Sequence, residues 1–150
     1  MNSGHGGGGP DYPDRDHPRP PGVDDATVEA VGKVTEALEA AERARGHLYS
    51  FHQITGHADL LLGEAVKMLR EAGHVEEAVL LETEVLGRNV IPGHWTFQIV
   101  EAYDAHYHRP FTDLEERVRR RLVGGLRHLH EAEMKEARRT RGHPGHTAHP

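Results

Sequence analysis

The sequence contains no cysteine. A chain without thiols can form no disulfide, no thiolate nucleophile and no cysteine-ligated zinc site. Long apolar runs are also missing: none approaches the roughly 18 residues needed to span a bilayer, so we expect no membrane segment. Residues 1–22 have no apolar stretch of the kind found in secretory signal peptides, which predicts a cytoplasmic protein.

Motifs for phosphate binding and nucleophilic catalysis are absent as well. The glycine run at residues 6–9 ends in proline and follows no predicted strand, so it does not fit a phosphate-binding loop. No serine lies in the sequence context of a nucleophile elbow. These absences favour a non-enzymatic protein.

Most of the sequence shows the periodicity of an α-helix. Apolar residues recur at intervals of three and four, and no stretch alternates with the two-residue period of a strand. The sequence therefore predicts an all-α fold, an antiparallel bundle of four to five helices, over residues 23–141. Residues 1–22 are predicted to be a disordered Gly- and Pro-rich arm, and residues 142–150 a disordered His-bearing tail, since neither can bury much apolar surface.

Glycine and proline set the predicted helix ends. Gly56 is expected to end or kink the first helix, and the residue before Pro110 avoids the helical region, so a new helix should begin there. The approximate predicted bounds are 24–56, 59–72, 75–86, 94–108 and from 110 onward.

Two predicted apolar faces bear on packing. In the second helix, Leu61, Ala65, Met68 and Leu69 are expected to point inward. In the last helix, the apolar stripe continues through Leu126 and Leu129, beyond the reach of a neighbouring helix of about 15 residues. The part of the stripe around Leu126 and Leu129 therefore needs another partner, either the first helix or a second chain.

Residues 62–88 resemble a tetratricopeptide-type helical hairpin, with small residues where two helices would cross. This resemblance implies two short helices joined by a tight turn. No second copy occurs at a spacing of about 34 residues, so the sequence does not predict a repeat protein.

Histidine is abundant, with 14 residues, and three of them lie at equal spacing within residues 47–57. His47, His52 and His57 are five residues apart, which places successive side chains about 140° apart around a helix axis. They therefore cannot form a metal site on a single helix. Of the three, His52 continues the inward stripe of the first helix and is the best candidate to join ligands from other helices.

The first alternative hypothesis for the function is a metal site whose ligands come from several helices. Bundles build histidine–carboxylate sites from facing helices, and such a site would hold iron or another transition metal for redox chemistry. The same polar residues can instead form solvated helix faces or pair with arginine. The candidate metal ligands are His52, Glu101, Asp104, His108 and Glu133.

Charge is distributed unevenly. Residues 23–110 contain 15 acidic and 7 basic residues, whereas residues 111–141 contain 6 acidic and 9 basic ones. Binding of nucleic acid through the basic helix is a second alternative. Acidic residues are interleaved with the bases and no aromatic residue accompanies them, which favours ion pairs within the helix. The arginines in question are Arg117, Arg119, Arg120 and Arg121.

The leading hypothesis from the sequence is a non-enzymatic helical-bundle module that acts by self-association or by binding a protein partner. It requires no cofactor. A homodimer is the expected assembly, because the predicted last helix extends beyond its neighbours.

Overall fold

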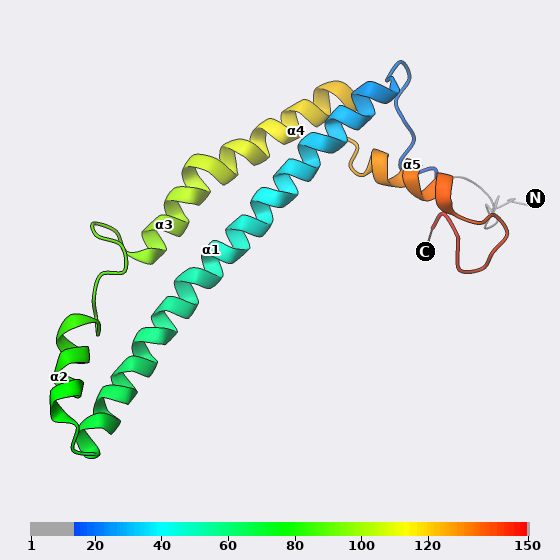
Figure 1. Ribbon diagram of the computed structural model, residues 1–150. Helices are drawn as coiled ribbons and strands as arrows, with labels where there is room; N and C mark the ends of the chain where they lie inside the picture. Colours follow the sequence, from blue (N-terminus) through cyan, green and yellow to red (C-terminus); the bar gives the residue numbers. More distant parts are fainter. Residues whose placement is uncertain (1–13, 150) are drawn as a thin grey trace, which may run out of the picture. The chain divides into compact units, whose positions relative to one another are not determined.

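A computed structural model describes residues 14–149 (Figure 1). These residues are mostly helical, and no strand forms among them apart from a single bridge between Ile91 and His94. The predicted all-α class is thereby confirmed. The prediction for residues 1–13 of the arm lies outside the described residues.

Three of the helical segments follow one another without a loop. The π-helix η1 (Asp104–His108) joins α3 (Thr96–Tyr103) directly to α4 (Arg109–Val123). Residues 14–149 therefore contain four helical stretches, not four to five, and their packing as an antiparallel bundle is not confirmed. The other three stretches are α1 (Asp25–Glu71), α2 (Val75–Glu84) and α5 (Leu129–Arg138).

Helix α1 runs for 47 residues, so the predicted break at Gly56 is wrong. A glycine in a helix interior costs about 1 kcal/mol relative to alanine, which a long helix with good helix formers and no proline can absorb. The helix ends instead near Gly73, whose φ of +89° is left-handed and suits glycine. Helix α2 then folds back beside the end of α1, and Arg70 pairs with Glu82 there (Figure 1).

The predicted break before Pro110 is also wrong, because the chain passes through η1 without leaving a helical conformation. The Arg109 N–H donates to the carbonyl of Asp104, five residues back. Pro110 has no N–H to donate, and its ring crowds the preceding turn of a regular α-helix. The wider π turn lies directly before the proline, where that crowding occurs.

The long last helix predicted from the sequence is interrupted at two glycines. Gly124 and Gly125 have φ values of +68° and +81°, a conformation that ends α4 and that other residues rarely adopt. His128 follows with φ of 60° before α5 begins. The prediction of one uninterrupted stripe through Leu126 and Leu129 was therefore wrong, because it ignored this glycine pair.

The chain divides into two compact units, both of which contain part of α1 and part of α4. Unit 1 combines residues 1–38 with residues 113–150, of which 14–38 and 113–149 are described. Unit 2 consists of residues 39–112. Each unit is considered below by itself.

Unit 1 has an apolar core in which α1, α4 and α5 meet. The buried residues are Val28 and Val31 of α1, Val123 of α4 and Leu129 of α5. Gly32 faces α5 so closely that a Cβ placed there would lie 3.2 Å from the Cβ of His130. Leu129 thus packs against α1, which is one of the two partners that the sequence left open for it.

Beside this core lies a buried ion pair. Glu115 and Arg119 are each only 6% exposed, and the Arg119 Nε donates to Glu115 at 3.1 Å. The Thr35 hydroxyl donates to the same carboxylate at 3.0 Å, and Arg119 also donates to the carbonyl of Gly125. These bonds satisfy both charges away from water and hold α1 against α4.

Part of the predicted arm, residues 14–22, is described and contacts α1 and α5 within unit 1. Arg19 donates to both carboxylate oxygens of Glu133 at 2.9 Å and to Asp25 at 2.6 Å. These two carboxylates raise the pKa of the Arg19 guanidinium above its ordinary value.

Candidate interaction surface

Unit 2 buries few apolar side chains, and those are small. Its buried apolar residues are Ala41, Val66, Ala78 and Val100. Of the 18 large apolar residues exposed among residues 14–149, 15 belong to unit 2. They are Tyr49, Phe51, Ile54, Leu60, Leu61, Met68, Val75, Val79, Leu80, Val85, Val90, Ile91, Trp95, Phe97 and Tyr107.

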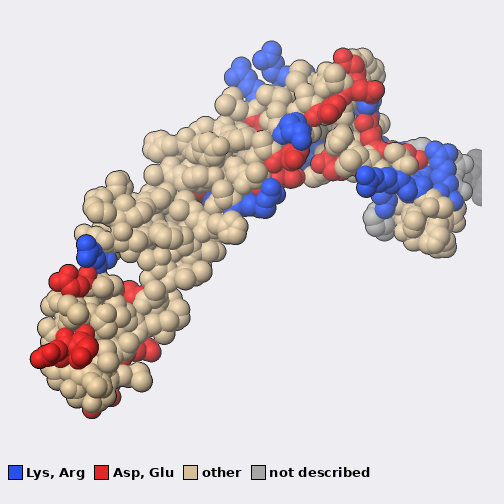
Figure 2. Space-filling model, viewed as in Figure 1, with Lys and Arg blue, Asp and Glu red and all other residues tan. Residues whose placement is uncertain are grey.

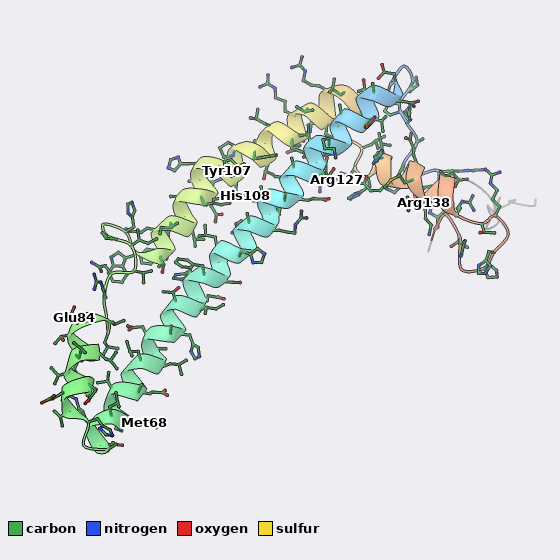
Figure 3. The ribbon with its side chains drawn as sticks, viewed as in Figure 1. Met68, Glu84, Tyr107, His108, Arg127 and Arg138 are labelled. Carbon is green, nitrogen blue, oxygen red and sulfur yellow. The ribbon has the colours of Figure 1, made fainter. Side chains whose placement is uncertain are left out.

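The predicted inward orientation of Leu61 and Met68 is therefore wrong. Leu61 is 50% exposed and Met68 is 67% exposed. Figure 3 labels Met68 near the C-terminal end of α1. The prediction assumed that a separate helix over residues 59–72 would turn its apolar face to the interior. Because α1 is continuous, residues 59–71 keep the orientation that contacts of its other face impose within unit 2.

That other face of α1 is held by polar contacts with α3 and η1. The Arg45 guanidinium forms two bonds with the carboxylate of Asp104, at 2.6 and 3.0 Å. The Tyr103 hydroxyl donates to the carbonyl of Ala41 at 3.1 Å. The three bonds fix which side of α1 faces α3.

An exposed apolar stripe lies on the opposite side of α1, about 150° around its axis from the residues that contact α3. Its members alternate at spacings of three and four residues, the heptad pattern of a coiled-coil contact. All are exposed except Ala65, which is partly buried. We call this stripe the α1 seam; its members are apolar except His47, and they comprise Ala40, Ala44, His47, Phe51, Ile54, Ala58, Leu61, Ala65 and Met68 of α1 and Ala72 directly after it.

The heptad repeat is visible in the sequence, yet the sequence analysis missed it. Placing a helix end at Gly56 divided the repeat into two short pieces, and the second piece was assigned to an interior. Gly56 itself lies outside the seam and has no atom within 4 Å of the position a Cβ would take. Following the seven-residue spacing across that glycine would have found the seam.

Two stretches without charged side chains accompany the seam in unit 2. Residues 46–58 and 89–100 contain no Lys, Arg, Asp or Glu, and the surface over α3 and the middle of α1 is largely uncharged (Figure 2). Trp95 is 72% exposed and its ring lies 5.7 Å from that of Phe97. Few charges and exposed aromatic residues are typical of the central part of protein–protein interfaces.

The predicted metal ligands of unit 2 lie in separate polar pairs. Asp104 is bonded to Arg45, and these bonds hold the pKa of its carboxyl below the ordinary value. His108 points toward α1, where its Nε2 lies 2.7 Å from Glu42 Oε1 (Figure 3). His52 Nδ1 lies 2.7 Å from the hydroxyl of Thr96. Each pair links α1 to α3 or η1.

The remaining two predicted ligands lie elsewhere. Glu101 is exposed on α3, and Glu133 of α5 pairs with Arg19 in unit 1. Within residues 14–149, three histidine or carboxylate ligand atoms come within 4.8 Å of one another at one place, formed by Asp14, Asp16 and His149. A metal role for the five predicted residues stays a prediction.

The four arginines predicted for nucleic-acid binding have different environments. Arg119 is buried against Glu115, and Arg120 pairs with Glu116 at 2.6 Å. Arg117 and Arg121 are exposed on α4. Nucleic-acid binding stays a prediction, and Arg119 is poorly placed to contribute to it.

A groove of about 420 Å³ lies between α1 and the segment that follows α2. It has the volume of a small-molecule site, but its two charged residues are already engaged in local bonds. Asp59 accepts the Gly87 N–H at 2.8 Å, and Arg88 donates to the carbonyl of Glu84 at 3.2 Å. Ala58 of the seam forms part of its rim.

Comparison of the chain with protein-family models, with curated proteins and with solved structures found no match. Among residues 14–149, no helix combines the length and the apolar character that crossing a membrane requires.

Proposed function

We propose that this protein is a non-enzymatic helical module that acts by self-association, with the exposed apolar surface of unit 2 as its interface. The observation that carries the proposal is the α1 seam, in which apolar residues at heptad spacing are presented to solvent along one face of a continuous helix. Exposure of such an apolar face to water is energetically unfavourable. A second helix that covers the face removes this unfavourable exposure.

The exposed apolar surface of the seam is large enough to support a weak dimer. The four large side chains of the seam, Phe51, Ile54, Leu61 and Met68, are each between 41% and 67% exposed. Full burial of such a side chain from a fully exposed state contributes about 1.5–3 kcal/mol, and because only about half of each is exposed, eight of them in a dimer would contribute about 6–12 kcal/mol. Association itself costs about 4–15 kcal/mol, so we expect a dimer that dissociates on dilution.

In this proposal the second copy completes the bundle that the sequence predicts. Two α1 helices would pack along their seams, while α3 stays on the opposite face of each α1 through Arg45 and Asp104. The predicted antiparallel bundle would then form between two chains. The compartment expected from the sequence is the cytoplasm, where an association module without disulfides would function.

Sedimentation of the full chain over a range of concentrations tests this proposal. We expect the wild type to move from monomer to dimer with rising concentration. Ile54→Glu should stay monomeric, because it places a carboxylate in the middle of the seam. Gln53→Glu is the matched control: it adds the same charge at the neighbouring exposed position outside the seam, and it should dimerise like the wild type. A monomeric wild type throughout would overturn the proposal.

A further inference from the structure

We infer that the two copies pair through the α1 seam in an antiparallel arrangement, with one defined register. This inference rests on the proposed function, since it specifies how the second copy is bound. Its two independent supports are the order of small and large residues along the seam and the order of charges beside it.

Small and large residues alternate along the seam so that an antiparallel copy fits. In an antiparallel coiled coil, the two classes of seam position oppose each other across the contact. Centring the pair between Ile54 and Ala58 sets small residues against large ones at three layers, and Phe51 against Leu61 at a fourth. The opposing pairs are Ala44 with Met68, His47 with Ala65, Ile54 with Ala58, and Phe51 with Leu61.

A parallel pair in register fits less well. Each residue would meet its own copy, so Phe51 would face Phe51 and Met68 would face Met68, while the alanine layers would leave gaps between them. Uneven layers of this kind combine crowding with cavities, and both are costly in a packed interface. The antiparallel register evens out three of the five layers, while Phe51 with Leu61 forms a large layer and Ala40 with Ala72, at the ends of the seam, a small one.

Charges beside the seam favour the same orientation. Arg43 lies next to the N-terminal part of the seam, whereas Glu64 and Glu71 lie beside its C-terminal part, all at the same heptad position. Residues at this position face one another in an antiparallel pair. The register given above sets Arg43 of one copy against Glu71 of the other at both ends, where the opposite charges attract.

Thiol cross-linking tests the orientation directly, and the absence of native cysteine makes every introduced thiol unique. Ala44→Cys and Met68→Cys are prepared separately in the full chain and treated with a short bismaleimide, alone and mixed. In the antiparallel register Cys at 44 opposes Cys at 68, while two copies of either one are about 36 Å apart along the axis. Gln53→Cys mixed with Met68→Cys reports random collision.

We expect cross-linked dimers at least tenfold above the collision control in the mixture, and near that control in each single variant. Efficient cross-linking of Met68→Cys alone would show a parallel pair and overturn the inference. A dimer by sedimentation that gives no cross-link above the control in any sample would place the contact on another surface, overturning the register and leaving self-association intact. A chain that stays monomeric would overturn both.

Discussion

The two units contain similar helical sequence but place their large apolar side chains differently. In unit 1, Leu129 is only 5% exposed and packs with valines from α1 and α4. In unit 2, Leu61 of α1 is 50% exposed, and Leu60 and Met68 are exposed as well. The comparison shows that an amphipathic helix does not reveal whether its apolar face is covered by its own chain or by another one.

The largest expected effect comes from the buried ion pair of unit 1. Arg119→Met removes the partner of the Glu115 carboxylate, which would remain buried and uncompensated. We expect a loss of about 3–5 kcal/mol in the free energy of unfolding, measured by urea denaturation with circular dichroism. 

Arg120→Met is the matched control on the same helix. Arg120 also pairs with the residue four positions earlier, Glu116, but both side chains are solvent-exposed. Its loss should cost only about 0.3–0.5 kcal/mol. Equal effects of the two substitutions would contradict the described burial of Arg119.

The same leucine substitution in the two units sharpens the comparison. Leu129→Ala removes a core side chain of unit 1 and should cost about 2–5 kcal/mol of unfolding free energy, with little effect on association. Leu61→Ala, made in the monomeric Ile54→Glu background, should change stability by less than about 0.5 kcal/mol. In the wild-type background, Leu61→Ala should instead weaken dimerisation, as measured by sedimentation. If it destabilised the monomer as strongly as Leu129→Ala does, its side chain would be packed within the chain.

Sequence periodicity predicted the helical class because spacings of three and four residues are a local property. It could not predict which neighbour covers each face, since that depends on where a helix continues or ends. Gly56 and Gly124 illustrate the limit: both lie in segments with helical periodicity, yet α1 continues through Gly56 whereas α4 ends directly before Gly124. The glycine pair Gly124 and Gly125 could have predicted the end of α4 from the sequence. The pairing of Arg45 with Asp104 could not be predicted in this way, because the two residues are far apart in the chain.

Acid should weaken the contact between α1 and η1 in unit 2. The Arg45 guanidinium lowers the pKa of Asp104, so the folded state favours the carboxylate more than the unfolded state does. The stabilisation is therefore complete above the unfolded pKa, near pH 4, and is lost as pH falls through the lower folded value. Asp104→Asn should cost stability at pH 7 and progressively less below about pH 4. A cost that stays constant down to pH 2 would contradict this pairing.

The smallest expected effect tests the continuity of α1, on which the seam depends. Gly56→Ala should raise the free energy of unfolding by about 0.5–1 kcal/mol, because alanine is the better helix former and a Cβ meets no atom within 4 Å there. Gly124→Ala should have the opposite sign, costing about 1–2 kcal/mol, because its φ of +68° is strained for alanine. Both are measured by thermal or urea unfolding. If Gly56→Ala were destabilising, the chain would bend at residue 56, and the heptad positions before and after it would no longer share one face.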